Sequence, residues 1–439
     1  PINMAIGGWK MHSRAGNYLP FDYSYNILQS TEENAIIFTN GDNDTFPLWY
    51  IQDVEGVRRD VRVVNLSLGN TLWYVDQLKN RQPWGAEKLP LSFADDSIQI
   101  DDESDSRALS YDFGEPREIA IPVRREILER YTDDPAVLED GHMRFTFEGT
   151  PYGEVQGRNM HLLRVQDKLV LDIMREVRFE RPVYFSNTVG PDAFAGLRDF
   201  FRYEGMAMRI CPVKQDDPRM TPLDPEIMEL CLIKNVDNSD SYSRTPQYGF
   251  KFRNLNNPDV YYDEVHRRLM STYRSLYLSY SNYHASIGNN KKAVEILDMM
   301  NEMISPKQFP MELEIAHRLL SMYEQFGAGE SALKYADIFL DQAMMLVDNP
   351  DIRKDLTYYE LADRNIGPHR MASQVHKLKG EYNKAIELLE KLKGKVSQTL
   401  ASVRGSQYKR EEQMLMQNLI DVEGNILLLK LEKAYEDNE

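Results

Sequence analysis

The residues best suited to chemistry form one short polar run, residues 40–44 (Asn-Gly-Asp-Asn-Asp), directly after an apolar stretch. Its two carboxylates stand two residues apart beside amide oxygens, a donor set that hard cations such as Ca²⁺ or Mg²⁺ prefer. The same groups can also hydrogen-bond the hydroxyl groups of a sugar. We therefore take Asn40, Asp42, Asn43 and Asp44 as ligand-binding candidates. A divalent cation held by Asp42 and Asp44 is the alternative for this run.

A structural explanation competes for the same residues. Asp44 or Thr45 can cap the helix that follows, and Asp42 can form an Asx turn. The run lacks the further ligands of an EF-hand, and no phosphate-loop glycine pattern accompanies it. The sequence leaves the ligand, the metal and the capping role open.

Two other predicted strands also end in polar residues. One covers residues 61–66 and carries Asn65 near its end, and the other covers residues 182–186 and ends at Ser186. Ligands of open parallel sheets bind in the crevice beyond the carboxyl ends of the strands. We therefore expect Asn65 and Ser186 to lie near the 40–44 run.

Other candidates carry less specific signals. His12 and Arg14 precede the first predicted helix and are included as ligand-binding residues, but no catalytic motif such as GxSxG or HExxH accompanies them. The sequence therefore identifies no catalytic residue. Trp49, Trp73 and Tyr74 fall at helical spacings on apolar faces. Such aromatic residues usually fill a core, and the alternative is a platform on which a sugar stacks.

The elements that must position these residues change in kind along the chain. Over residues 1–213 strands alternate with helices, which predicts an α/β domain with a mostly parallel sheet and an acidic insertion near residues 84–150. Residues 214–258 are broken by prolines, which predicts a linker. Residues 259–439 show helical periodicity throughout and predict an all-α, helical-repeat domain.

The helical part repeats one turn pattern three times. Each copy has a glycine followed five residues later by an alanine, with apolar helical runs on both sides: Gly288 and Ala293, Gly327 and Ala332, and Gly380 and Ala385. The pattern resembles the turn of a tetratricopeptide repeat, in which a small residue lets two helices pack closely. The spacing between copies is irregular, so a plain helical bundle remains the alternative.

Composition excludes several classes of protein. The 439 residues carry a net charge of −17, which argues against a nucleic-acid partner. No apolar stretch reaches the ~18 residues that a membrane span requires. Cys211 and Cys231 allow one disulfide or two free thiols. The start at Pro1 has no signal-peptide features, so we expect a processed or truncated chain.

Several runs together resemble a known family. Residues 39–50 (TNGDNDTFPLWY), supported by the runs 12–18, 60–68, 70–74, 181–185 and 260–264, resemble a Bacteroidetes-type family of bacterial membrane proteins of unknown function. That family is similar to protein O-mannosyltransferases in its membrane-spanning first half. The resemblance covers most of residues 9–305 and is specific in the first 80 residues, whereas the helical tail matches loosely.

The resemblance implies a place and a partner. It implies a region outside the membrane, at the periplasmic face of the bacterial inner membrane, preceded by a membrane-embedded, transferase-like region of the same protein. The catalytic residues of a mannosyltransferase-like activity would lie in that other region, so none is carried over to this chain.

Three functions follow as hypotheses. The first is an extracytoplasmic region that binds or presents an acceptor, a glycan or, through the helical repeats, a partner protein. The second is a stand-alone enzyme that uses the crevice at residues 40–44. The third is a scaffold subunit of a membrane complex.

Overall fold

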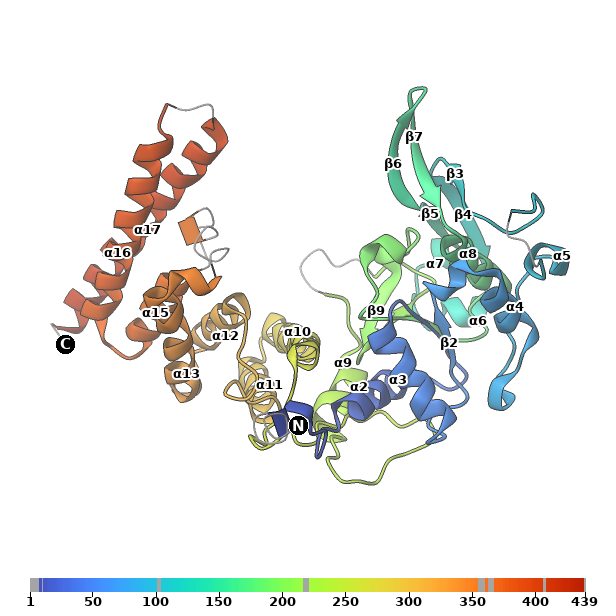
Figure 1. The fold of residues 1–439 in the computed structure, drawn as a ribbon, viewed down its shortest axis with the longest axis horizontal. Coiled ribbons are helices and arrows are strands. Elements are labelled where there is room, and N and C mark those ends of the chain that lie inside the picture. Colours follow the sequence, from blue (N-terminus) through green and yellow to red (C-terminus); the bar gives the residue numbers. More distant parts are fainter. Residues whose placement is uncertain are drawn as a thin grey trace. The chain divides into compact units, whose positions relative to one another are not determined.

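The computed structural model describes residues 8–9, 11–100, 104–215, 221–353, 360–361, 367–405 and 408–437. The chain divides into two compact units, Pro1–Tyr283 and His284–Glu439. Strands occur in the first unit, and the second is helical (Figure 1).

A five-stranded sheet forms the centre of the first unit, in the order β2-β1-β8-β10-β9. Its strands are β1 (Ile36–Thr39), β2 (Arg62–Asn65), β8 (Val183–Ser186), β9 (Phe201–Glu204) and β10 (Ala207–Ile210). β1 runs parallel to both β2 and β8, whereas β10 runs antiparallel to β8 and β9. The sheet is therefore mixed, and the three strands that carry the predicted site are the parallel ones.

Helices complete the α/β architecture. They are α2 (Leu19–Gln29), α3 (Asp42–Asp53), α4 (Leu72–Asn80) and α8 (Val165–Val177), with short 3₁₀ turns η1 (Leu68–Asn70) and η2 (Pro83–Gly85). One hydrophobic core joins alternate residues of the sheet, such as Ile36 and Phe38, to Val75 of α4 and Leu169 of α8. This alternation follows from the two-residue period of a strand.

The acidic insertion and the residues directly after it, up to Leu163, form two small antiparallel sheets. One pairs β4 (Arg117–Pro122) with β5 (His142–Phe147), and the other has the order β3-β7-β6. The remaining elements here are α5 (Asp95–Ile98), β3 (Asp112–Gly114), α6 (Arg125–Leu128), α7 (Pro135–Asp140), β6 (Thr150–Val155) and β7 (Arg158–Leu163).

The sequence pattern also predicts a helix over residues 194–201, and the structure shows that this is wrong. Two 3₁₀ turns, η3 (Pro191–Ala193) and η4 (Arg198–Phe200), lie here instead. Ala195 and Gly196 have φ angles of 51° and 87°, in the left-handed region that interrupts a right-handed helix. A Cβ on Gly196 would lie 1.9 Å from the carbonyl oxygen of Thr146, so only glycine allows this approach.

The predicted domain boundaries stay a prediction, but the segment expected to be a linker contains buried structure. It includes α9 (Pro225–Glu229) and the π-helical turn η5 (Leu230–Lys234), while residues 216–220 lie outside the described ranges. Lys251 exchanges backbone hydrogen bonds with the Asn26 side chain of α2, and Arg253 forms a buried ion pair with Asp22 at 2.6 Å. These contacts anchor the segment within the first unit.

The rest of the chain is helical. Its helices are α10 (Glu264–Ser286), α11 (Asn290–Met303), α12 (Leu313–Gln325), α13 (Gly329–Asp348), α15 (Pro368–Leu378), α16 (Tyr382–Val403) and α17 (Lys409–Glu436), with the 3₁₀ turn η6 (Pro350–Arg353). No strand occurs in the described part of residues 260–437. Neighbouring helices from α12 to α17 pack on one another in chain order. These observations confirm an α/β region followed by an all-helical region with the packing of a repeat array.

The three predicted repeat turns have one geometry. Gly288, Gly327 and Gly380 have φ angles of 79°, 73° and 71°. In each turn the residue after the glycine donates its N–H to a carbonyl five residues earlier at 2.8 Å, from Asn289 to His284, from Ala328 to Tyr323 and from Glu381 to His376. This is the Schellman pattern that ends a helix at a left-handed residue.

Candidate functional site

The three parallel strands bring their polar ends to one edge of the sheet, as the sequence predicts. Thr39 of β1 pairs in register with Asn65 of β2, and Phe38 pairs with Phe185, the residue before Ser186. Thr39, Asn65 and Ser186 are all buried. Together with Asn40, Asp44 and Thr45 they form what we call the strand-end cluster.

Asp44 links two of these strand ends. Its Oδ2 accepts a hydrogen bond from Thr188 Oγ1 at 2.5 Å, and Thr188 in turn bonds Ser186 at 2.8 Å. The same Oδ2 accepts the backbone N–H of Asn40 at 3.3 Å. Burial raises the pKa of Asp44, and the hydrogen bonds from Thr188 and Asn40 oppose that shift.

Thr45 links the ends of β1 and β2. Its Oγ1 lies 2.8 Å from Thr39 Oγ1 and accepts a hydrogen bond from Asn65 Nδ2, also at 2.8 Å. Asn40 Oδ1 accepts from Ser67 Oγ at 2.6 Å. The polar atoms of the strand-end cluster are thus largely directed at one another, which suits a structural role for the Asp44 carboxylate.

The other predicted site residues lie elsewhere. Asp42 and Asn43 are exposed on the first turn of α3. His12 and Arg14 are exposed in the segment before α2, where Arg14 Nη1 donates to the carbonyl of Met11 at 3.1 Å. Within the described ranges, no group of three or more His, Cys, Asp or Glu residues is placed to hold a metal ion.

A cavity of about 360 Å³ lies beside the edge strand β2. Three of the four tryptophans in the chain line it, Trp49 from α3, Trp73 from α4 and Trp84 from η2. Trp73 and Trp84 are 57% and 40% exposed, so neither ring is buried in the core. The ring of Tyr74 lies 6.3 Å from that of Trp49 and 5.6 Å from that of Trp73. We call this cavity the tryptophan pocket.

Polar groups fix the geometry of the tryptophan pocket. Trp84 donates its indole N–H to Asp53 Oδ1 at 2.9 Å, and the guanidinium of Arg59 lies 5.9 Å from its ring. Arg62, buried in the pocket wall, donates through Nη2 to three carbonyls at the end of α4. Its Nε has no hydrogen-bond partner in the part of the chain that the structure describes.

The backbone also holds Trp84 in place. Its φ angle of 56° lies in the left-handed region, which is rare for a bulky residue and costs roughly 1–2 kcal/mol. Such strain recurs at ligand-binding sites. Sequence reasoning singled out Trp49 and Trp73 but missed Trp84, although three tryptophans within residues 49–84 were a visible signal.

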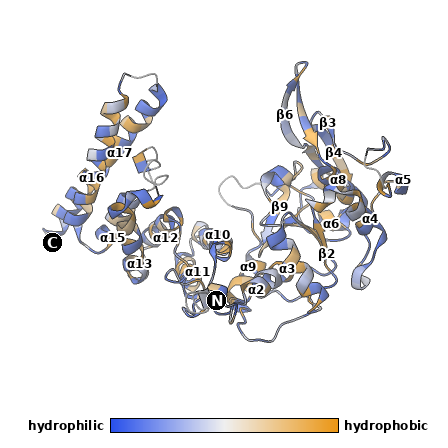
Figure 2. Ribbon diagram, viewed as in Figure 1, coloured by the Kyte–Doolittle hydropathy of each residue, from blue (hydrophilic) through white to orange (hydrophobic). Residues whose placement is uncertain are grey.

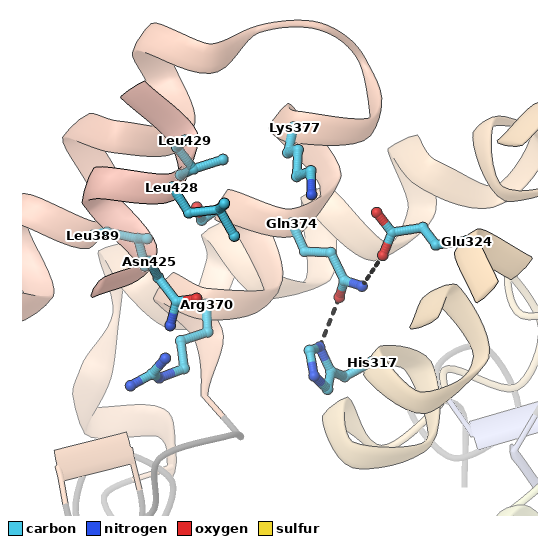
Figure 3. A pocket seen from close by; sticks show the side chains of 10 residues that line it. His317, Glu324, Arg370, Gln374, Lys377, Leu389, Asn425, Leu428 and Leu429 are labelled. Atoms are coloured by element: carbon cyan, nitrogen blue, oxygen red, sulfur yellow. Dashed lines mark hydrogen bonds between the residues drawn. The ribbon is translucent and has the colours of Figure 1, made fainter. Parts of the chain in front are cut away.

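The helical unit has a cavity of its own, of about 260 Å³, formed by α12, α15, α16 and α17 (Figure 3). His317 Nδ1 lies 2.7 Å from Gln374 Oε1, and Gln374 Nε2 donates to Glu324 at 2.9 Å. The two cations of the lining are paired, Arg370 with Asp421 at 3.0 Å and Lys377 with Glu432 at 3.1 Å. Both cations are therefore paired with carboxylates of the same chain, while the carboxylate of Glu324 accepts its hydrogen bond from a neutral amide.

Comparison with known proteins connects the first unit to a family. A family model described as TMEM260-associated domain 2 matches residues 20–113 and 133–227, which is less than half of the chain. The match links the chain to a protein O-mannosyltransferase-like membrane protein. Searches among curated proteins and solved structures gave no match. None of the described helices has both the length and the hydropathy of a membrane span.

Proposed function

We propose that this chain is an extracytoplasmic region of a glycosyltransferase-like membrane protein and that its tryptophan pocket binds a glycan, either free or on an acceptor. In this proposal it works beside a membrane-embedded, transferase-like region at the periplasmic face of a bacterial inner membrane. The family match supports the link to glycosyl transfer. Both matched blocks lie in the first unit, and the first block includes the residues that line the pocket.

One observation carries the proposal: three tryptophans and Tyr74 surround a single cavity. Aromatic faces supply apolar contact area at low conformational cost, and ligand pockets combine such walls with a few placed polar groups. Here those groups are Arg62, Gln77 and Asp53. The volume of about 360 Å³ lies at the lower end of the range for small-molecule sites.

The charge of the lining favours a neutral ligand. Arg62 and Asp53 are its charged residues, and they carry opposite signs. Burial raises the pKa of Tyr74 to about 12, so its hydroxyl is neutral at physiological pH. A neutral hexose, with C–H groups for the indole faces and hydroxyls for the polar groups, fits this lining. The family link makes mannose-containing oligosaccharides the first ligands to test.

The test is calorimetric titration of the chain with short neutral oligosaccharides, beginning with mannose-containing ones. We expect binding, and we expect Trp73→Ala to weaken it by roughly tenfold or more, since an aromatic contact contributes about 1.5 kcal/mol. Because Trp73 is exposed, the melting temperature of that variant should stay close to the parent's.

Tyr50→Ala is the matched control, since Tyr50 is exposed on α3 and does not line the pocket. It should leave sugar binding unchanged. If no oligosaccharide binds, or if both variants weaken binding equally, the glycan-binding proposal fails. A scaffold role within a membrane complex would then be favoured, because the strand-end cluster is already occupied by its own hydrogen bonds.

A further inference from the structure

The last described helix, α17, has hydrophobic and hydrophilic residues interspersed along its length (Figure 2), and the burial of its side chains divides the hydrophobic ones between two faces. One face is buried: Leu415, Val422, Ile426 and Leu429 join α16 residues such as Leu389 and Leu392 in a single core. The other face is exposed and consists of Met416, Ile420, Leu427, Leu431 and Tyr435, which are 47–69% accessible. We call this second set the outer stripe.

The outer stripe is one continuous surface of the helix. Its residues are separated by four, seven, four and four positions, the spacing that places side chains on one side of a helix. At 1.5 Å per residue, the stripe from Met416 to Tyr435 runs for roughly 28 Å. Single exposed apolar residues are ordinary, but a contiguous patch of this length marks an interaction surface.

The neighbouring helix shows the contrast. α16 has no large exposed hydrophobic residue in its described length, and its solvent side carries ion pairs such as Lys391 with Glu387. The outer stripe is therefore a feature of α17 that its neighbour α16 lacks, and a contiguous apolar row of this kind marks a surface that a partner covers.

We propose that the outer stripe packs against the same stripe of a second copy of this chain, with the two α17 helices antiparallel about a two-fold axis. The stripe is nearly self-complementary in that arrangement. Met416 lies opposite the partner's Tyr435, and Ile420 lies opposite the partner's Leu431. Gly424 lies opposite the partner's Leu427, and no atom outside its own helix backbone lies within 4 Å of where its Cβ would be, so the helices can approach closely there.

Charges beside the stripe repeat the same symmetry. Glu423 and Lys430 flank it on one side, one on each side of the proposed axis. In the antiparallel dimer each Glu423 therefore faces a Lys430 of the other copy. Each is paired within its own chain, with Lys393 at 2.9 Å and Glu390 at 3.4 Å, so the dimer joins them into one alternating network.

The same charges argue against a lipid surface as the occupant. Acidic side chains outnumber basic ones on α17, whereas helices that lie on anionic membranes carry Lys and Arg on their polar face. A second copy is also the partner most often found for a self-complementary patch, because two-fold interfaces use one surface twice.

Sedimentation velocity over a concentration series tests the proposal. The full chain should sediment as a dimer, and Leu427→Asp should raise the dimer dissociation constant by roughly tenfold or more. Leu333→Asp, at an exposed leucine of α13, is the matched control and should not change it. Unchanged far-ultraviolet circular dichroism in both variants shows that the helices remain folded.

A charge exchange tests the antiparallel register. Glu423→Lys should weaken the dimer, and Glu423→Lys combined with Lys430→Glu should restore it, because each pair is re-formed with reversed signs. A chain that stays monomeric throughout the series overturns the proposal, as does a dimer that Leu427→Asp leaves intact. Failure of the double variant to recover overturns the antiparallel pairing. Binding of the monomer to anionic phosphatidylglycerol vesicles instead would assign the stripe to a membrane.

Discussion

Asp44 matches a ligand-binding pattern in the sequence, and its contacts in the structure suit a structural role. Its carboxylate accepts hydrogen bonds from Thr188 and from the backbone of Asn40, while only 4% of the residue is exposed. Removing this acceptor would leave both donors unpaired. Asp44→Ala should therefore lower the free energy of unfolding by about 1–3 kcal/mol and leave sugar binding unchanged, as denaturant melts and calorimetry would show.

The raised pKa of Asp44 also predicts how its contribution to the free energy of unfolding changes with pH. Burial raises that pKa above 3.8 in the folded protein, so the folded state holds the proton more tightly than the unfolded chain. Its contribution to stability is therefore fully present below pH 3.8 and is lost as pH rises through the folded pKa. Urea melts should show the parent losing stability relative to Asp44→Asn between acidic and neutral pH. A difference that stays constant or grows in the parent's favour contradicts the assignment.

The two cysteines resolve a choice that the sequence left open. Cys211 and Cys231 are both buried and both free. Burial raises the pKa of Cys211 to about 12 and raises that of Cys231 as well, so neither thiolate forms at neutral pH. In a thiol-reagent assay both should stay unmodified in the native protein, and two equivalents should react in denaturant. Rapid modification of either thiol in the native state would show that the local packing is different.

At the scale of elements, the repeat turns give a prediction about packing. Ala293, Ala332 and Ala385 are fully buried, and Ser373 of α15 donates a hydrogen bond to the carbonyl of Ala385 at 3.0 Å. A larger side chain at a fully buried position has to displace its neighbours. Each Ala→Leu change should cost about 1–3 kcal/mol in thermal or urea unfolding. Lys384→Leu, at an exposed neighbour, should cost far less, and equal effects would mean that the alanines are not at close helix contacts.

Elements with a clear period were the predictable part of the fold. Strands at 36–39, 62–65 and 183–186 follow from short apolar runs, and the helices after residue 260 follow from their 3.6-residue spacing. The helix expected at 194–201 does not form, because Ala195 and Gly196 take left-handed conformations where the chain meets the backbone of Thr146. That contact joins segments about fifty residues apart, so the local hydrophobic periodicity cannot predict it.

Of the two candidate sites in the first unit, one could be predicted from the sequence and the other could not. Register between parallel strands could be predicted, and it brings Asn40, Asp44, Asn65 and Ser186 into one cluster. The tryptophan pocket could not be predicted from the sequence, because it depends on the packing of Trp84 in η2 against residues of α3 and α4. His12 and Arg14 belong to a run that resembles the family but have no catalytic motif around them, and in the structure Arg14 bonds the carbonyl of Met11.

At the scale of the whole molecule, the two units have different proposed tasks. The α/β unit carries the proposed glycan site, and the helical unit carries the surface proposed to pair two copies. The two proposals are independent, because Trp73 and Leu427 lie in different units. Trp73→Ala should therefore leave sedimentation unchanged, and Leu427→Asp should leave the intrinsic affinity for a sugar unchanged.

The most direct test of the glycan site uses the four tryptophans as probes. Their indole N–H groups give four signals in a ¹⁵N-labelled protein, from Trp9, Trp49, Trp73 and Trp84. On titration with a mannose-containing oligosaccharide, the signals of Trp49, Trp73 and Trp84 should shift together with one dissociation constant. Trp9, which does not line the pocket, should not move. Four unmoved signals, or a shift confined to Trp9, would contradict glycan binding in the tryptophan pocket.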